Sequence, residues 1–335
     1  MRARRVAVLF MISAALFIGL PVIPVHGGTG TTWTVVVGGA NQDSSVVSSG
    51  SFPHTLTVAV GDTVYWTFDR QWPEHTVTFL SGAQPPMIDV EQGGKSFLNP
   101  QVGFPAGGPT YDGTGYHNSG MPPDPSKPFS YRLTFTKPGT FVYVCILHPG
   151  QGGTVIVKSR TGDTPEQATA RGQRELAAAL RTGTHAYSQW RPTVSGKTVT
   201  IPLIGDAQAH WSVLRFTPTP LTITRGTTVI WEMRDPQEIH AVTFPGGQAG
   251  VSNFIIPQPQ PGGPPKLLEN PQVTTHTPAT EYSGDGLVSS GIIFPPGIPG
   301  NPPTSYRLTF TKPGQFSYVC SVHAPQGMWG TIIVK

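Results

Sequence analysis

The chain contains 335 residues, which corresponds to about two domains at roughly 150 residues per domain. Its 40 glycines and 36 prolines approach the content of disordered chains, but 37 % hydrophobic and 10 % aromatic residues exclude that class. The formal net charge of +4 includes three arginines within the first five residues. This charge does not indicate the clustered basic surface that binding of nucleic acid needs. The composition favours an all-β protein whose short strands are joined by long loops.

The N-terminus has the pattern of an export signal. A basic stretch, Met1–Arg5, precedes the almost wholly apolar run Val6–Val25. The run is long enough to cross a bilayer, and Val25-His26-Gly27 is not an Ala-x-Ala cleavage site. Residues 1–28 are therefore predicted to be either a cleaved signal peptide or an uncleaved membrane anchor. In both cases the remaining chain is expected outside the cytoplasm, in the periplasm, at the cell surface or secreted.

The rest of the chain contains an internal duplication. PFSYRLTFTKPGTFVYVC at 128–145 returns as PTSYRLTFTKPGQFSYVC at 303–320, and the segment 56–79 matches 221–244 in the same way. A period of this length indicates a duplicated domain rather than a solenoid. Alternating apolar and polar residues, bounded by Gly and Pro, predict several strands. In the first copy these are Leu56–Val60, Thr63–Phe68, Arg132–Thr136 and Thr140–Cys145.

One helix is predicted between the copies. Thr164–Gln167 provides an N-cap, Pro at the first helical position and an amide partner in the first turn. The strong helix formers of Ala168–Arg181 follow, and Gly183 is expected to end the helix. We interpret 159–195 as a linker whose helix lies against one of two domains, 29–158 and 196–335.

Each repeat contains one cysteine, one histidine three residues later and one histidine at an upstream strand end. These are Cys145, His148 and His75 in the first copy, and Cys320, His323 and His240 in the second. A thiolate, two imidazoles and a weak axial ligand form a blue-copper electron-transfer site. A lone histidine or buried cysteine is usually structural, but recurrence in register favours metal binding. Zinc ligation and a disulfide between the two cysteines remain as alternatives.

The sequence around the cysteines resembles the plastocyanin-like cupredoxins. Their Tyr-x-Cys-x-x-His signature matches Tyr143–His148 and Tyr318–His323, and the family's axial Met matches Met328. The resemblance implies two tandem cupredoxin domains, each a Greek-key β-sandwich or barrel, joined by a short α-helical linker. It also implies one type 1 copper per domain, cycling between Cu(I) and Cu(II).

The first copy departs from this pattern in its ligand loop. The loop is two residues shorter than the second, a length that resembles the amicyanin type, and the third residue after its histidine is Gln151. A Gln oxygen is an attested axial ligand in blue-copper sites, as in the stellacyanin-like members. Gln326 has the same spacing from His323, so a shared loop residue with a three-coordinate or water-ligated site is the alternative.

The expected function is one-electron transfer, with electrons passing between the two coppers. A harder axial oxygen favours Cu(II), so the first site is expected to have the lower potential. An offset of ~120 mV would bias an electron ~100-fold toward the second copper, at ~59 mV per tenfold. Redox protein partners are expected to dock at an uncharged collar, Pro149-Gly150 and Ala324-Pro325, where the family's ligand-histidine ring edge reaches the surface.

The sequence leaves two other functions as alternatives. A copper-trafficking or storage protein would need clustered thiols or methionines, whereas the six methionines are dispersed. An enzyme related to multicopper oxidases or copper nitrite reductases would need a second kind of copper site. The oxidases bind their trinuclear centre largely through His-x-His pairs, and the sequence contains none. We therefore expect no enzymatic activity and no catalytic residues.

Long segments separate the histidine strand from the cysteine strand in each copy. His75 and Cys145 are 70 residues apart, and His240 and Cys320 are 80 apart. The second segment contains PQPQPGGPP at 257–265 and FPPGIPGNPP at 294–303. Loops of this length are usually functional or disordered, and their prolines favour extended polyproline conformations. The sequence assigns no chemistry to them.

Overall fold

A computed structural model describes residues 30–68, 74–122, 127–160 and 162–335. The predicted signal or anchor, 1–28, lies outside these residues. Within the described ranges, no helix has both the length and the apolar character needed to span a bilayer.

The secondary structure of the described residues is mostly β-strand. The N-terminal part contains β1 (Thr32–Val37), β2 (Val46–Val47), β3 (Ser51–Phe52), β4 (Thr55–Ala59), β5 (Thr63–Phe68), β6 (Thr78–Phe79), β7 (Asp89–Gln92), β8 (Lys95–Leu98), α1 (Pro100–Gly103), β9 (Thr110–Tyr111), β10 (His117–Asn118), β11 (Phe129–Phe135), β12 (Gly139–Val144) and β13 (Gly152–Lys158). The long helix α2 (Pro165–Gln189) follows. The C-terminal part contains β14 (Thr193–Ser195), β15 (Thr198–Leu203), β16 (Gly205–Asp206), β17 (Trp211–Val213), β18 (Leu221–Ile223), β19 (Thr228–Met233), β20 (His240–Phe244), β21 (Ile255–Gln260), β22 (Gly263–Glu269), α3 (Pro271–Thr274), β23 (Glu281–Tyr282), β24 (Val288–Ile293), β25 (Ser305–Phe310), β26 (Gly314–Val319) and β27 (Trp329–Val334).

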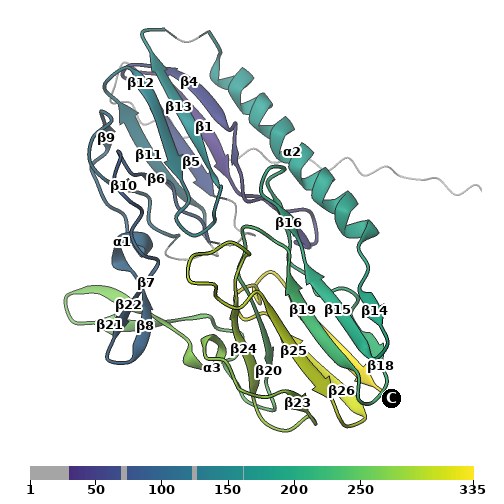
Figure 1. Cartoon of the computed structure of the whole chain (residues 1–335). Helices are drawn as coiled ribbons and strands as arrows, with labels where there is room; N and C mark the ends of the chain where they lie inside the picture. The colour runs from purple at the N-terminus through teal and green to yellow at the C-terminus, as the bar shows by residue number, and fades with distance from the viewer. Residues whose placement is uncertain (1–29, 69–73, 123–126, 161) are drawn as a thin grey trace, which may run out of the picture.

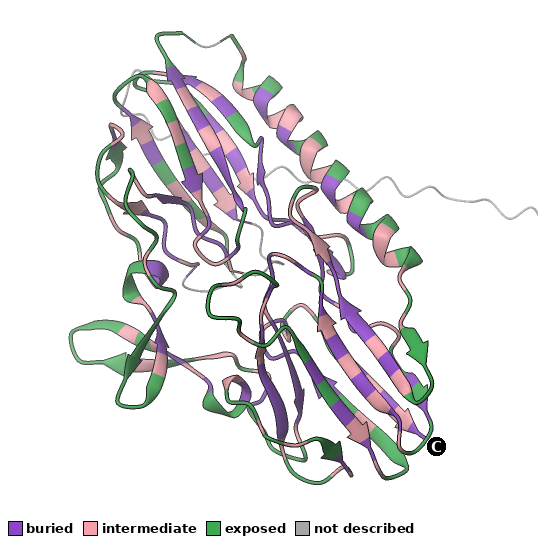
Figure 2. Cartoon of the chain, in the orientation of Figure 1, coloured by how far each residue is buried: buried purple, intermediate pink, exposed green. Residues whose placement is uncertain are grey.

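Two five-stranded sheets form the first sandwich, with strand orders β3-β1-β5-β11-β9 and β10-β6-β12-β13-β4. Alternation along β5 buries Val64, Trp66 and Phe68, while the residues between them are partly exposed (Figure 2). Trp66 meets Tyr143 from the facing sheet edge-on, with ring centroids 5.4 Å apart. This aromatic contact joins the two sheets through Tyr143, which lies two residues before Cys145.

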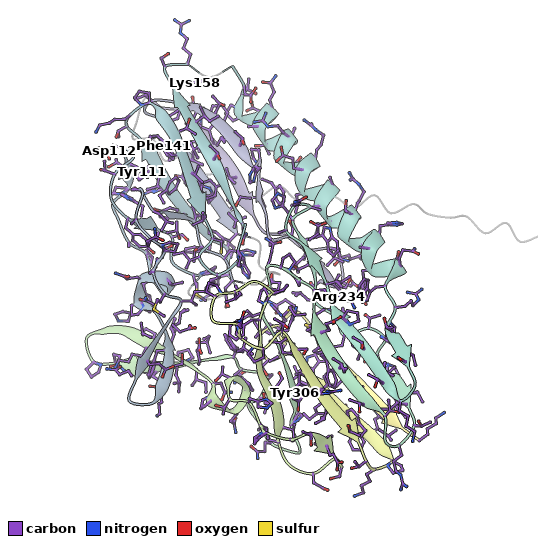
Figure 3. The ribbon with its side chains drawn as sticks, in the orientation of Figure 1. Tyr111, Asp112, Phe141, Lys158, Arg234 and Tyr306 are labelled. Carbon is purple, nitrogen blue, oxygen red and sulfur yellow. The ribbon has the colours of Figure 1, made fainter. Side chains whose placement is uncertain are left out.

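The second sandwich repeats this arrangement with sheets β14-β15-β19-β25-β23 and β18-β27-β26-β20-β24. Trp231 and Tyr318 reproduce the aromatic contact at 5.3 Å, and Tyr306, labelled in Figure 3, stacks on Trp231. The all-β fold predicted from the sequence is confirmed. The repeated core explains why the aromatic and β-branched residues of the two copies follow the same alternation.

Helix α2 begins as predicted and ends later than predicted. The Thr164 side chain accepts from the N–H of Gln167, and the Gln167 side chain accepts from the N–H of Thr164. The helix then continues through Gly183 to Gln189, so the expected stop is wrong. A Cβ on Gly183 would lie 2.6 Å from a Val46 methyl and 2.9 Å from Trp211. This glycine therefore provides a close packing contact instead of a helix end.

The helix contacts strands from both copies, which corrects the expectation that it lies against one domain (Figure 1). It packs on β1 and β3 of the first sandwich and on β17, a strand of the C-terminal part that lies outside the two sheets of the second sandwich. Near its start, a Cβ on Gly172 would lie 2.6 Å from the nitrogen of Pro53, so the helix touches the first sandwich there through backbone. A small sheet, β16-β17-β2, adds a second connection by pairing Ser212 with Val47.

The long insertions are ordered and pair with each other. The hairpins β7–β8 and β21–β22 form a four-stranded sheet in which Phe97 pairs with Leu268 (Figure 1). The segment 257–265, expected as extended polyproline, instead makes up most of the β21–β22 hairpin. Its prolines are tolerated in β21 because this strand lies at the edge of the sheet. The insertions thus form a third connection between the two sandwiches.

Candidate metal centres

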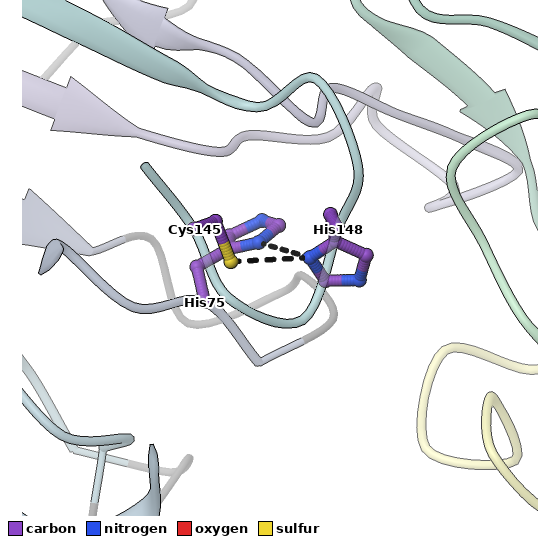
Figure 4. Close-up of side chains that lie close together, drawn as sticks. All are labelled: His75, Cys145 and His148. Atoms are coloured by element: carbon purple, nitrogen blue, oxygen red, sulfur yellow. Dashed lines mark hydrogen bonds between the residues drawn. The ribbon is translucent and has the colours of Figure 1, made fainter. Parts of the chain in front are cut away.

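The first cluster brings together His75, Cys145 and His148, as predicted (Figure 4). Cys145 directly follows β12, His148 lies in the β12–β13 loop, and His75 lies just before β6. The Cys145 Sγ is 3.5 Å from the His148 Nδ1, which is 3.0 Å from the His75 Nδ1. All three side chains are buried. One cysteine sulfur and two imidazole nitrogens, all atoms that bind metals, therefore lie close together and are shielded from solvent.

The second cluster repeats this geometry with His240, Cys320 and His323. The Cys320 Sγ lies 3.7 Å from the His240 Nδ1 and 3.6 Å from the His323 Nδ1, and the two nitrogens are 3.2 Å apart. These residues are also buried. Both cysteines are free and belong to separate clusters, which excludes the disulfide considered from the sequence.

Each sulfur accepts a hydrogen bond from the backbone. The N–H of Thr76 donates to the Cys145 Sγ at 3.3 Å, and the N–H of Ala241 donates to the Cys320 Sγ at 3.3 Å. Both donors directly follow the upstream histidine. An N–H aimed at a sulfur stabilises the thiolate, which is the form that binds metals.

The electrostatics of the clusters also favour thiolates. Burial would raise the pKa of Cys145, but the His148 and His75 rings outweigh burial and hold the pKa well below its ordinary value. The same balance at the second cluster, dominated by His323 and His240, lowers the pKa of Cys320 to about 5. Both shifts favour the thiolate, the form of the sulfur that binds metals.

The predicted axial residues occupy equivalent backbone positions. The N–H of Cys145 donates to the carbonyl of Gln151 at 2.9 Å, and the N–H of Cys320 donates to the carbonyl of Met328 at 3.0 Å. Both side chains are buried. Neither polar side-chain atom of Gln151 has a hydrogen-bond partner among the described residues. A buried amide without hydrogen-bond partners is costly, so its oxygen is suited to bind a metal ion.

A carboxylate that the sequence analysis did not single out lies between the clusters. Glu238, two residues before His240, is buried, and its Oε2 is 3.2 Å from the Nε2 of His148 and 3.2 Å from the Nε2 of His323. The His323 contact is an ion pair that lacks hydrogen-bond alignment. The only sequence signal is a difference between the copies, because Pro73 stands at the matching position of the first repeat.

These contacts change the electrostatics of Glu238 and both rings. Burial would raise the pKa of Glu238, but His148 and His323 outweigh burial and hold the pKa well below its usual value. Burial would lower the pKa of His323, but Cys320 and Glu238 raise it to about 10. Each ring therefore lies between a cysteine sulfur on its Nδ1 side and the Glu238 carboxylate on its Nε2 side.

The ring edges of His148 and His323 do not reach the surface as the resemblance implied. Their exposed fractions are 6 % and 1 %, because each ring faces Glu238. A cavity of about 460 Å³ opens beside these contacts. Residues of the predicted collar, among them Pro149 and Pro325, line this cavity.

The donor chemistry fits the implied metal. A thiolate, two imidazole Nδ1 atoms and a buried thioether or amide form the set that copper electron-transfer sites use. Zinc can share the thiolate and imidazoles, but its structural sites lack Met ligands. Each cluster can thus hold one metal ion with the residues present.

Comparisons with known proteins gave matches among solved structures alone. No family model matches the chain, and no curated protein matches it. An oxidized mutant of amicyanin is 16 % identical over 43 % of this chain and 91 % of its own, with a TM-score of 0.24. A reduced Cu(I) form of another amicyanin mutant is 17 % identical over 43 % and 92 %, with the same TM-score.

Proposed function

We propose that this chain is a copper-binding electron-transfer protein built from two tandem cupredoxin domains, 29–158 and 196–335, with one type 1 copper in each. The linker 159–195 would join them. The observation that carries the proposal is the recurrence of one buried cluster in both halves, with the same three donor atoms and the same backbone N–H on the sulfur. Copper supplies a one-electron Cu(I)/Cu(II) couple when bound.

The residues of the chain perform the remaining tasks. Cys145, His148 and His75 would hold the first ion, and Cys320, His323 and His240 the second. Each set lies on strand ends and short loops fixed by the sandwich core, and this rigidity keeps the reorganisation on electron transfer small. Burial excludes water from both sets.

Gln151 and Met328 are assigned as the axial ligands. Their matching backbone hydrogen bonds support this assignment, and the unpartnered amide of Gln151 supports it independently. Since an amide oxygen favours Cu(II) more than a thioether does, the first centre is expected to have the lower reduction potential. Electrons would then pass from the first centre to the second within one chain.

We place the protein outside the cytoplasm on the basis of its N-terminal sequence, either released or anchored by residues 1–28. Its partners would be redox proteins that dock on uncharged residues near the ligand loops. Pro149 and Pro325 are exposed beside the buried rings and belong to such a surface. We expect electron transfer without catalysis.

The experiment that tests the proposal uses the mature protein loaded with copper. We expect two copper ions per chain, an intense visible absorption from thiolate-to-copper charge transfer, and the paramagnetic-resonance signal of type 1 copper. Cys145→Ser and Cys320→Ser, made separately, should each remove one copper and about half of the absorption.

Three other results would contradict the proposal. Zinc in the purified protein without visible absorption would indicate structural metal sites. More than two coppers per chain, or rapid loss of copper to a chelator, would indicate storage. Turnover that depends on oxygen or nitrite would indicate an enzyme.

A further inference from the structure

The two candidate metal centres share one carboxylate oxygen. The Oε2 of Glu238 lies 3.2 Å from the Nε2 of His148 and 3.2 Å from the Nε2 of His323, and the two rings come from different sandwiches. On the other side of each ring, Nδ1 faces the cysteine sulfur, at 3.5 Å in the first cluster and 3.6 Å in the second. A chain of close contacts therefore runs from one sulfur to the other through a single oxygen atom.

This arrangement fixes the chemistry of both rings. A histidine that binds metal through Nδ1 carries its proton on Nε2, and that N–H needs an acceptor when it is buried. His148 and His323 are almost fully buried, and the Glu238 Oε2 lies 3.2 Å from the Nε2 of each, as a charge partner that lacks hydrogen-bond alignment at His323. The carboxylate thus favours the tautomer whose Nδ1 is free to bind a metal ion, and it orients the two rings at the same time.

The backbone of the turn that carries Glu238 is held by hydrogen bonds. The side chain of Asp235 accepts hydrogen bonds from the N–H groups of Gln237 and Glu238, at 2.9 and 3.2 Å. Within the same turn, the Gln237 side chain donates to the carbonyl of Pro149 at 3.1 Å and accepts from the Ser49 hydroxyl at 2.7 Å. The turn from the second sandwich is therefore anchored to the first at the residue that follows His148.

We propose, on the basis of the function proposed above, that Glu238 is a shared positioning residue for both metal centres and joins them into one unit. It touches neither expected metal ion, and it acts by holding the Nε2 side of each terminal histidine. One substitution in the second sandwich should therefore weaken both centres, including the one whose ligands all lie in the first sandwich.

The test measures metal affinity at each centre separately. Cys320→Ser isolates the first centre and Cys145→Ser the second, and each is titrated with Cu(II) and, in parallel, with Co(II) against a chelator. Loss of an outer-shell partner typically costs ~10–100-fold in affinity. We expect Glu238→Ala to produce a loss of this size at both centres, and Glu238→Gln to recover most of it, because the amide oxygen still accepts from Nε2–H.

The control is Glu269→Ala. Glu269 lines the same cavity, but it interacts with Asp89 and Ser96 and not with a ligand ring, so both affinities should stay unchanged. An unchanged affinity at either centre in Glu238→Ala would overturn the proposal, as would an equal loss in Glu269→Ala.

A second measurement covers the case in which Glu238→Ala does not fold. In the metal-free wild-type chain labelled with nitrogen-15, we expect Nε2–H resonances from both His148 and His323 that exchange slowly with water and shift in Glu238→Gln. The absence of an Nε2 proton on either ring would overturn the proposal. The Co(II) titration distinguishes failure of the proposed copper function from failure of the Glu238 proposal. If the wild type lacked type 1 copper spectra but Glu238→Ala still weakened Co(II) binding at both centres, only the proposed function would be refuted.

Discussion

The backbone N–H of Cys145 donates to the carbonyl of Gln151 at 2.9 Å and thereby closes the first ligand loop. In the second loop the same bond runs from Cys320 to Met328, although that loop is two residues longer. Strand pairing agrees, since the residue after Gln151 pairs with Val144 and the residue after Met328 pairs with Val319. The two copies therefore present a different side chain from one backbone position.

Replacing Gln151 by Met should make the first centre resemble the second. A thioether stabilises Cu(I) relative to an amide oxygen, so the reduction potential of the first centre should rise. We expect a rise of about 120 mV, which is ~100-fold in the Cu(II)/Cu(I) equilibrium at ~59 mV per tenfold. A redox titration of Gln151→Met in the Cys320→Ser background measures this shift. An unchanged potential would mean that Gln151 is only a loop residue.

The reverse substitution, Met328→Gln, should lower the potential of the second centre by a similar amount. The Cys145→Ser background isolates that centre for the titration. Met328→Leu provides the matched control, because it keeps the buried volume while removing the sulfur. If Met328→Leu and Met328→Gln gave the same potential, the side chain at this position would act through packing and not through a donor atom.

The cysteine and histidine ligands of both sites could be predicted from the sequence because they recur in the two copies. Cys145 and Cys320 each precede a histidine at the same spacing, and the two copies support one another. Glu238 could not be predicted, since only the second copy has a carboxylate at that position and its role arises from contact with a ring in the other sandwich. The burial of His148 was missed for the same reason.

The fold shows a similar limit. The strand from Thr63 to Phe68 was predicted at its observed bounds because its side chains alternate between core and surface. The sheet formed by the insertions depends on Phe97 pairing with Leu268, which are distant in sequence, and no local pattern specifies such a register. The prediction that the helix ends at Gly183 was wrong because the sequence does not distinguish a glycine that ends a helix from one that allows close packing against a neighbouring element.

Gly172→Ala should destabilise the protein despite improving helix propensity. Propensity alone would favour Ala over Gly by about 1 kcal/mol. The new Cβ would lie 2.6 Å from the Pro53 nitrogen and 2.7 Å from the Phe52 carbonyl carbon, and backbone atoms cannot move aside easily. We expect a net loss of roughly 1–3 kcal/mol, as for other overpacked sites, measured by urea unfolding.

Gly162→Ala serves as the control for that substitution, since a Cβ there meets nothing within 4 Å. Its free energy of unfolding should stay close to that of the wild type. A stabilised Gly172→Ala variant would mean that helix α2 does not approach the first sandwich as closely as described.

Glu269 should make the stability of the protein depend on pH. This residue lies at the end of β22, in the sheet that connects the two sandwiches through their insertions. Burial, followed by a hydrogen bond with Asp89 and the charge of that residue, raises the pKa of Glu269 to about 8 from its ordinary 4.5. The folded protein therefore binds a proton more tightly here than the unfolded chain does. The stabilisation is fully present below about pH 4.5 and is lost as the pH rises through about 8.

Glu269→Gln should remove that dependence, because an amide keeps the hydrogen-bonding shape of the protonated acid and does not ionise. We expect the Tm of the wild type to fall relative to that of Glu269→Gln between about pH 4.5 and about pH 8. Differential scanning calorimetry of the metal-free proteins across this range measures the difference. Removal of copper from both samples keeps the titration of the ligand groups the same in each. Parallel curves for the two proteins would show that Glu269 is already ionised in the folded state and that its contact with Asp89 does not hold a proton.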